Sequence, residues 1–238
     1  MEKKDLLYEG KAKKVYRTSS EKIVWIEYLD HATALNGLMK DQISGKGELN
    51  NQITSKIFYY LSEQGITNHF IQQLGKNEQL VERLEIIPLE VVVRNVAAGS
   101  FSKRLAIHEG QKLPTPIVEF YYKEDKLDDP FINDEHVLFL NIADEEEIHE
   151  LKEQARKINQ ALIDLFQKID LQLIDFKLEF GKTEQGKIVL GDEISPDTCR
   201  LWDMKTNEHM DKDVYRKKIG KIVPVYQEVL TRLTQLGC

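Results

Sequence analysis

An α+β fold of two lobes is predicted by the order of the segments, the chain length and one proline. Strand-like and helix-like segments are mixed without the strict β-α-β alternation of a doubly wound sheet. A chain of 238 residues is long enough for one large or two small domains with a buried core. Pro88 would interrupt a strand, because proline donates no ladder hydrogen bond. We therefore expect an N-terminal lobe over residues 1–85 and a C-terminal lobe over residues 86–238.

The composition is that of an acidic, globular protein. Hydrophobic residues make up 41% of the chain and charged residues 31%, which is typical of folded domains. The formal net charge of −7 argues against non-specific binding to nucleic acid or to an acidic membrane surface. No apolar run approaches the roughly 20 residues of a spanning helix, and the N-terminus leads into no signal core. We expect a cytoplasmic protein whose partners are small molecules, not nucleic acid or membrane.

The first part of the chain is predicted to form a hairpin, a helix and two further strands. Residues 13–18 and 22–28 are rich in strand-forming residues and are separated by the turn Ser19-Ser20-Glu21. A helix that ends near Gly65 follows. Its apolar face consists of Ile53, Ile57, Phe58 and Leu61. The two strands are expected over residues 79–84 and 89–93, on the two sides of Pro88.

In the second part the clearest element is a long helix that begins after Asp144. Asp144 is a good N-cap residue, and three glutamates follow it in the first turn, where negative charge is favourable. Its predicted core face consists of Ile148, Leu151, Ala155, Ile158, Leu162, Leu165 and Ile169. Strands are predicted over residues 173–180 and 187–194, and helices over residues 211–219 and 223–236.

Charged and apolar residues alternate along the first of these two strands. A strand would place Asp175, Lys177 and Glu179 on one face. If Gln185-Gly186 is a two-residue hairpin loop, Glu179 lies directly opposite Asp192, with the Cβ atoms about 4.5–5.5 Å apart.

Two facing carboxylates repel each other unless a cation or a proton lies between them. One or two carboxylates, completed by substrate phosphates, are ligands that Mg²⁺ prefers. Two interpretations stay open from the residues alone: a metal site at Glu179 and Asp192, or a surface pair that Lys177 or Lys187 neutralises.

Two further segments carry cations next to small residues, where backbone N–H groups could approach a phosphate. In the first, Gly10 and Ala12 flank Lys11 and Lys13, which share a face if the chain is extended. In the second, Arg94 ends a strand, and a short helix to about residue 109 could begin with Ser100 as its cap. The alternatives are a solvated lysine-rich segment and an ordinary cap beside a surface arginine.

The last candidate segment follows the second strand. Pro196-Asp197 predicts a turn, so Arg200 could fold back over the hairpin. Cys199 is interpreted as a small loop residue and not as a nucleophile, because the sequence shows no evident base partner for it and no histidine close by. The only other cysteine is Cys238, which excludes a disulfide framework. The six histidines show no metal-ligand spacing.

Together these segments resemble the SAICAR synthase (phosphoribosylaminoimidazole-succinocarboxamide synthase) family in its short bacterial form. The similarity runs essentially from end to end. It is carried by residues 9–13 (EGKAK), 93–100 (VRNVAAGS), 175–181 (DFKLEFG) and 191–197 (GDEISPD).

The resemblance implies a small kinase-like N-terminal lobe that binds ATP and a larger ATP-grasp-related C-terminal lobe, with the active site in the cleft between them. It implies a ligase of de novo purine biosynthesis that converts CAIR, L-aspartate and ATP into SAICAR, ADP and phosphate. A homodimer is also an expectation of the family.

The resemblance also implies roles for individual residues. Gly10, Lys11, Ala12 and Lys13 would hold the ATP phosphates, and Val15 would belong to the same nucleotide site. Glu179 and Asp192 would carry Mg²⁺. Arg94, Ser100 and Arg200 would bind the 5′-phosphate of CAIR, and Lys177 would face its carboxylate.

The reaction needs an activated carboxylate, because an amine does not displace hydroxide from a carboxylate at neutral pH. ATP could supply an acyl phosphate, with Lys11, Lys13 and Lys177 neutralising charge along the transfer axis. A general base for the aspartate ammonium is needed, and Asp175 and Asp197 are both candidates.

Two other functions are alternatives to this ligase. A small-molecule kinase would show no aspartate requirement, and the sequence lacks a kinase-like His-Arg-Asp loop. A non-catalytic nucleotide-binding module would bind ATP without turnover.

Overall fold

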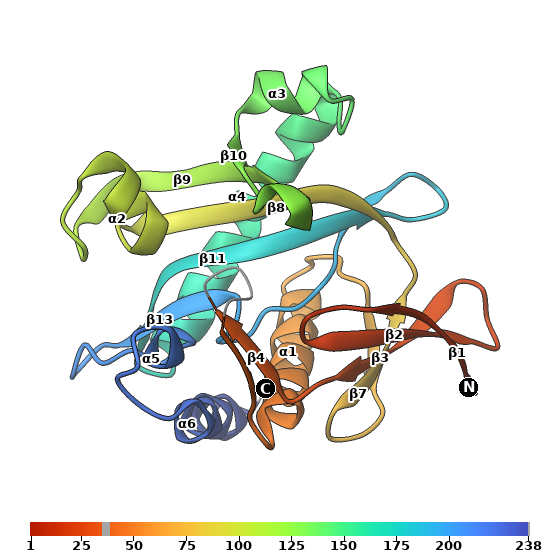
Figure 1. Cartoon of the computed structure of the whole chain (residues 1–238), viewed down its shortest axis with the longest axis horizontal. Coiled ribbons are helices and arrows are strands. Elements are labelled where there is room, and N and C mark those ends of the chain that lie inside the picture. Colours follow the sequence, from red (N-terminus) through yellow and green to blue (C-terminus); the bar gives the residue numbers. More distant parts are fainter. Residues whose placement is uncertain (35–38, 238) are drawn as a thin grey trace.

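Two antiparallel sheets organise the chain in the computed structural model, which describes residues 1–34 and 39–237 (Figure 1). The strand order is β1-β2-β3-β7-β6 in the first sheet and β10-β9-β8-β11-β12 in the second, where β13 pairs with β11. The mixed α and β content without β-α-β alternation agrees with the predicted class. Cys238 lies outside the described residues.

The first sheet contains the predicted hairpin. Its strands are β1 (Lys3–Glu9), β2 (Lys13–Thr18), β3 (Ile23–Tyr28), β7 (Glu78–Glu82) and β6 (Phe70–Gln73). The hairpin of β2 and β3 and its turn are confirmed. Strand β1 was missed because all seven of its residues are exposed, so it shows no alternation. A small separate pair, β4 (His31–Ala34) and β5 (Met39–Gln42), was missed as well.

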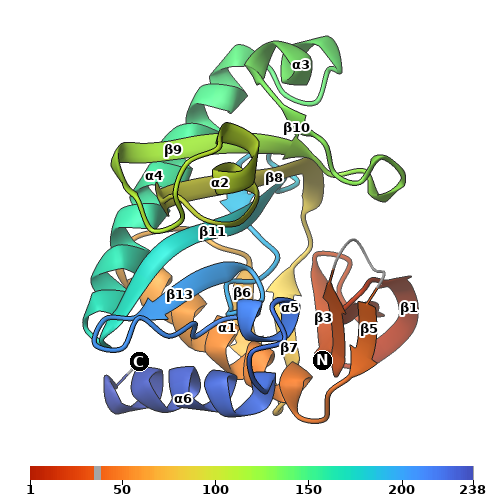
Figure 2. The ribbon, with the colours of Figure 1, turned by 60° about the vertical axis from the view of Figure 1, so that its left-hand side comes forward.

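The predicted helix in the first part is α1 (Lys46–Glu63), and it joins the main core. Ile53, Ile57, Phe58 and Leu61 are all buried, as predicted. Helix α1 packs against α6 (Ile222–Gln235) near the other end of the chain, and the two lie side by side in Figure 2. Residues from the two ends of the sequence therefore share one core.

The second sheet begins at residue 85. Its strands are β8 (Glu85–Val96), β9 (Lys112–Tyr122), β10 (Phe131–Ile132), β11 (Leu171–Lys182), β12 (Ile188–Leu190) and β13 (Cys199–Asp203). The expected break at Pro88 is wrong, because β8 runs through it. Glu90 and Ile86 of β8 pair with Glu179 and Gly181 of β11, so Pro88 falls within an irregularity of the ladder, where a missing N–H is tolerated.

The long helix is confirmed as α4 (Glu145–Gln167). The side chain of Asp144 accepts a hydrogen bond from the Glu147 backbone N–H, and the Glu147 side chain accepts one from the Asp144 N–H. The predicted core face of α4 is buried along its length.

The remaining helices are short. They are α2 (Gly99–Leu105), the 3₁₀ turn η1 (Asp125–Leu127), α3 (Asp134–Phe139) and α5 (Asp213–Arg216). Of the predicted helix over residues 211–219, only the four residues of α5 are helical. Within the described residues, no helix combines the length and the apolar character needed to span a membrane.

The predicted register between β11 and β12 is wrong by one residue. The Thr183 N–H donates to the Lys187 carbonyl at 3.0 Å, so the loop has three residues, 184–186, and not two. Gly186 has a φ of 78°, as expected for a three-residue loop with a left-handed last residue. Phe180 therefore pairs with Leu190, and Glu179 lies opposite Gly191 instead of Asp192.

Candidate active site

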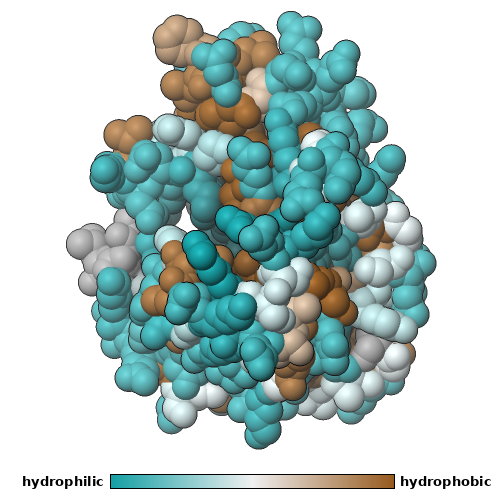
Figure 3. All heavy atoms as spheres, turned by 90° about the vertical axis from the view of Figure 1, so that its right-hand side faces the viewer, coloured by the Kyte–Doolittle hydropathy of each residue, from teal (hydrophilic) through white to brown (hydrophobic). Residues whose placement is uncertain are grey.

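One cavity of about 570 Å³ lies where the turn between β1 and β2 meets the second sheet. Figure 3 shows a hollow between the upper and lower parts of a largely hydrophilic face. The predicted site residues that line the cavity are Lys11, Ala12, Arg94, Ser100, Asp175, Lys177, Asp197 and Arg200. Lys13, Glu179 and Asp192 are not in the lining but form ion pairs with lining residues, Lys13 with Glu193 and the two acids with Lys177. Gly10 and Val15 are not among the lining residues.

A buried network on the second sheet holds Arg94. Its Nε donates to Glu119 at 2.7 Å and its Nη1 to Asp175 at 2.9 Å. Its Nη2 donates to Tyr121 at 3.0 Å and lies 3.4 Å from the Ser100 hydroxyl. Arg94, Glu119 and Asp175 are each less than a tenth exposed. The guanidinium is therefore fixed in one orientation, with its outer edge near the cavity.

Arg200 joins the same network from β13. It pairs with Asp175 at 3.0 Å and with Asp213 at 3.0 Å. Gly99 has a φ of 54°, and a Cβ atom there would lie 2.5 Å from the Arg200 guanidinium, so the close approach requires glycine. The two arginines and Ser100 are brought together as predicted. Ser100 is not the helix cap, however, because Ala98 is the N-cap residue of α2.

The Glu179 and Asp192 carboxylates both lie near the same cation, the Lys177 ammonium, although the predicted register between β11 and β12 is wrong by one residue. Lys177 Nζ forms an ion pair with Glu179 and lies 3.6 Å from Asp192. Asp192 has a left-handed backbone, with a φ of 54°, which breaks the alternation after β12 and lets its carboxylate approach Lys177. Burial favours the neutral amine of Lys177, but the carboxylates outweigh it and raise its pKa well above the ordinary value.

Two more lysines complete this charged cluster. Lys123 pairs with Glu179 at 2.9 Å, and Lys13 forms an ion pair with Asp192 and lies 3.8 Å from Glu193. Burial opposes the charged form of Asp192, but Lys13 and Lys177 lower its pKa. The Glu193 Oε2 atom is buried and has no hydrogen-bond partner among the described residues.

The glycine-lysine segment forms a turn and not an extended run. The Gly10 N–H donates to the Lys13 carbonyl at 2.8 Å, which closes the turn between β1 and β2. Lys11 and Lys13 consequently reach different carboxylates: Lys11 pairs with Asp125 of η1 at 2.8 Å, while Lys13 pairs with Asp192. Val15 packs against the small core of the first sheet.

The predicted turn at Pro196-Asp197 places Asp197 in a second buried cluster. Its carboxylate accepts hydrogen bonds from Lys46 of α1 and Tyr226 of α6, each at 2.5 Å, and Lys212 lies 3.7 Å away. Burial opposes the charged form, but the lysines lower the pKa of Asp197. Sequence analysis missed Lys46, Lys212 and Tyr226.

Cys199 lies in β13 and not in a loop, so that part of the prediction is wrong. It is buried, and burial raises the pKa of its thiol. A neutral thiol is a poor nucleophile, which agrees with the prediction that Cys199 is not one.

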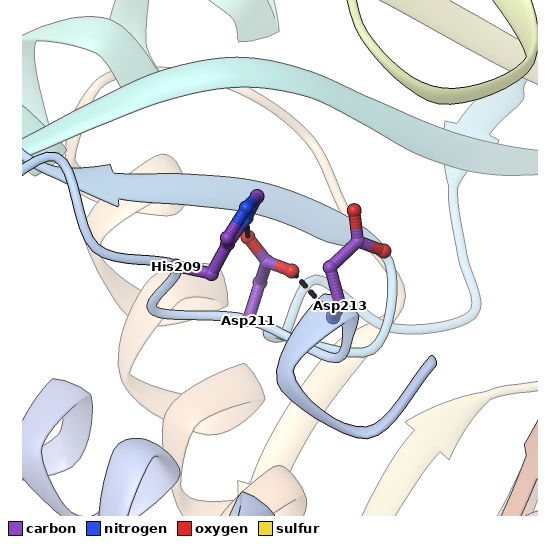
Figure 4. Close-up of side chains that lie close together, drawn as sticks. All are labelled: His209, Asp211 and Asp213. Carbon is purple, nitrogen blue, oxygen red and sulfur yellow. Dashed lines mark hydrogen bonds and ion pairs between the residues drawn. The ribbon is translucent and has the colours of Figure 1, made fainter. Parts of the chain in front are cut away.

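His209 lies beside β13, where it forms a bridge with Trp202, and two carboxylates lie close to it. One ligand atom each of His209, Asp211 and Asp213 lie within 4.8 Å of one another (Figure 4). Both carboxylates already have partners: Asp213 accepts from Arg200 and Arg216, and Asp211 accepts from the backbone N–H groups of Leu201 and Asp213. These contacts within the protein account for the positions of both carboxylates.

The ion pairs of Asp213 predict a pH-dependent contribution to stability. Burial raises the pKa of Asp213, but Arg200 and Arg216 outweigh it and hold the pKa at about 2. A lowered carboxyl pKa stabilises the fold above the unfolded value near 4, and this stabilisation is lost as the pH falls toward 2. We expect Asp213→Asn to cost about 2 kcal/mol at neutral pH and progressively less below about pH 4.

Urea denaturation at a series of pH values measures this difference. Asp5→Asn, at an exposed position, is the matched control and should leave the unfolding free energy within about 0.5 kcal/mol of the original at each pH. A cost of Asp213→Asn that stays constant from about pH 6 to pH 3 would contradict the interpretation.

Comparison with known proteins identifies the chain's relatives. A profile of the SAICAR synthetase family matches residues 6–233. The phosphoribosylaminoimidazole-succinocarboxamide synthase of Enterococcus faecalis is 64% identical over 233 residues, which cover 98% of both chains. Among solved structures, the corresponding synthase of Ehrlichia chaffeensis is 45% identical and superposes with a TM-score of 0.94, covering 97% of this chain and 98% of the other. A SAICAR synthetase in complex with ADP is 49% identical, with a TM-score of 0.93 and the same coverage.

The fold, the charged cavity and these matches define an enzyme of the ATP-dependent ligase class. More particularly, the chain belongs to the SAICAR synthetase family, which confirms the resemblance found in the sequence.

Proposed function

We propose that the protein joins CAIR and L-aspartate at the expense of ATP to give SAICAR, ADP and phosphate, a step of purine biosynthesis. The family membership over the whole chain and the ADP bound to a relative of similar fold support this proposal. The observation that carries it is one cavity bordered by two arginines held by the same carboxylate, Arg94 and Arg200, and by the lysine–carboxylate cluster around Lys177.

The nucleotide is assigned to the turn between β1 and β2. Gly10, Lys11, Ala12 and Lys13 would hold its phosphates, and Val15, on the first sheet, would belong to the same site. Lys11 is half exposed and pairs with an exposed carboxylate, Asp125, so the exchange of this partner for a phosphate costs little.

Mg²⁺ is assigned to Glu179 and Asp192, and the donor set fits it. Their carboxylates both contact one cation of the protein, the Lys177 ammonium, and the next residue after Asp192, Glu193, has a buried Oε2 atom with no hydrogen-bond partner among the described residues. Hard oxygen donors completed by phosphate oxygens suit this ion. When bound, the ion would neutralise charge on the β- and γ-phosphates.

The 5′-phosphate of CAIR is assigned to Arg94, Ser100 and Arg200. The carboxylate of Asp175 lies between the two guanidinium groups and holds both in place, so their orientation does not depend on the ligand. Lys177 would then face the CAIR carboxylate.

The chemistry proposed is activation followed by substitution. A CAIR carboxylate oxygen attacks the γ-phosphorus of ATP, the bond to the bridging oxygen breaks, and ADP leaves. The aspartate amine then attacks the carbonyl carbon of the acyl phosphate, and phosphate leaves with the electron pair of the broken C–O bond. Lys11, Lys13 and Lys177 would offset the negative charge that gathers during both steps.

Part of the proposal concerns the larger assembly. The proposed division is an ATP-binding, kinase-like lobe over residues 1–85 and a substrate- and metal-binding, ATP-grasp-related lobe over residues 86–238. The proposed oligomeric state is a homodimer. The passage of the chain from the first sheet to the second between β7 and β8 supports the position of this boundary.

ADP release, measured with each substrate omitted in turn, tests the function. We expect ADP only when CAIR and aspartate are both present, and a product whose mass shows the added succinyl amide. ADP release that ignores aspartate would overturn the ligase proposal and favour a small-molecule kinase.

A further inference from the structure

Lys212 is a buried lysine at the edge of the cavity that no role described so far uses. It precedes α5, and its backbone N–H donates to the Pro196 carbonyl at 2.9 Å, which ties it to the turn that carries Asp197. Its side chain lines the cavity, and only 11% of it is exposed.

The carboxylate nearest to Lys212 is already neutralised. Lys212 Nζ lies 3.7 Å from Asp197 Oδ2, the same oxygen that Lys46 contacts at 2.5 Å. Lys46 is completely buried, and the Tyr226 hydroxyl donates to the other oxygen of Asp197. One carboxylate therefore lies between two lysines, and the closer one balances its charge.

The other charged groups around Lys212 leave an excess of positive charge there. Arg216 of α5 adds a positive charge, and Glu193 adds a negative charge that lies near Lys13 at 3.8 Å. Burial lowers the pKa of Lys212, Lys46 and Arg216 lower it further, and Asp197 and Glu193 do not compensate.

The lysines of the charged cluster behave in the opposite way. Burial favours the neutral form of Lys13 and Lys177 as well, but each contacts a carboxylate more closely than Lys212 contacts Asp197, and these closer ion pairs raise the pKa of both. The two acids considered as bases are also committed: Asp175 to two arginines, and Asp197 to Lys46 and Tyr226. Among these cavity groups, the Lys212 amine is the one most readily available to accept a proton.

We propose that Lys212 is the general base that accepts a proton from the amino group of the second substrate. The step rests on the proposed function. The neutral form of the Lys212 amine, which burial, Lys46 and Arg216 favour, accepts one proton from the ammonium of aspartate, and the freed nitrogen lone pair attacks the activated carbonyl carbon. As the N–C bond forms, the C–O bond to phosphate breaks and the nitrogen loses a second proton to phosphate. Lys212 returns its proton to solvent through the cavity.

Lys212→Arg separates a base from a mere cation. Arginine supplies a permanent positive charge at this position but does not accept a proton in this pH range. We expect kcat to fall about 100-fold while KM for aspartate changes less than about threefold, and the acid limb of the pH profile of kcat to disappear. Lys221→Arg, at an exposed position before α6, is the matched control and should leave both constants unchanged.

A second variant checks the same role independently of charge. We expect Lys212→Ala to lose activity and to recover at least tenfold in kcat when a small primary amine such as ethylamine is added, with greater recovery at higher pH. Near-normal kcat in Lys212→Arg, or no recovery of Lys212→Ala by the amine, would overturn the assignment.

The two proposals fail in different ways. If the original protein forms no succinyl amide from CAIR and aspartate, the proposed function itself is wrong. If it forms the product and Lys212→Arg forms it equally fast, only the role of Lys212 is wrong.

Discussion

Arg94→Leu is expected to lower the free energy of unfolding by about 3–5 kcal/mol. The substitution removes the buried partner of both Glu119 and Asp175. Arg104 and Arg200 remain as second partners of these acids, but neither reaches the position between them. A buried carboxylate that loses one of its two hydrogen-bonded cations keeps the cost of its desolvation with less to offset it, so the loss exceeds what the intact pair contributes.

Urea denaturation at neutral pH measures this loss. Arg156→Leu is the matched control, because Arg156 pairs with Glu153 on the exposed surface of α4 and should cost less than about 1 kcal/mol. A loss of similar size in both variants would show that the Arg94 network contributes no more than a surface pair.

Glu179→Gln is expected to reduce kcat about 100- to 1000-fold while the protein stays folded. The substitution removes one of the two negative charges assigned to the metal and the nucleotide phosphates. The fold should tolerate it, because Lys177 keeps Asp192 and Glu90 as partners, at 3.6 Å and 3.3 Å. The same result is expected for Asp192→Asn.

Steady-state assays and a Mn²⁺ titration in the presence of ADP measure the effect. Both variants should bind the ion more weakly than the original protein. Glu184→Gln is the control, because Glu184 lies in the exposed loop of the same hairpin and should change neither activity nor ion binding. Full activity of Glu179→Gln would remove the basis for a metal site at these acids.

Elements whose signals are local were predicted well from the sequence. The capping box of α4 and the apolar face that follows it lie within one helix, so no distant contact can override them. The same holds for the hairpin of β2 and β3. Strand β9 was missed because Pro114 and Pro116 argue against a strand, although in the structure they lie in the part of β9 before its pairing with β8 becomes continuous at Ile117.

Most of the predicted site residues line one cavity or contact its lining, but the geometry between them was not predicted. The hairpin loop has one residue more than the two-residue turn assumed, and a shift of one residue changes which side chains face each other. Glu179 and Asp192 nevertheless meet, because the left-handed backbone of Asp192 redirects its side chain. No local pattern indicates such a backbone at an aspartate.

Several partners of Arg94 and Asp197 were not predicted, for a different reason. Glu119 comes from β9, Lys46 from α1 and Tyr226 from α6, so each contact joins segments far apart in the chain. A single lysine or glutamate on a predicted helix or strand is most often solvated, and only the tertiary fold shows that these are buried.

The pairing of each of Lys11, Lys13 and Lys177 with a carboxylate of the protein itself has a consequence for ligand selection. An incoming anion does not find an unpaired lysine at these three positions. It must displace a carboxylate of the protein from each lysine that it binds. For Lys13 and Lys177, whose ion pairs are largely buried, most of the Coulombic gain is thereby cancelled, whereas the exposed Lys11 pair is broken at little cost. A small ion such as sulfate or free phosphate should therefore compete poorly. Only a molecule that displaces several of these carboxylates at once, through a fixed spacing of its charged groups, should hold the site.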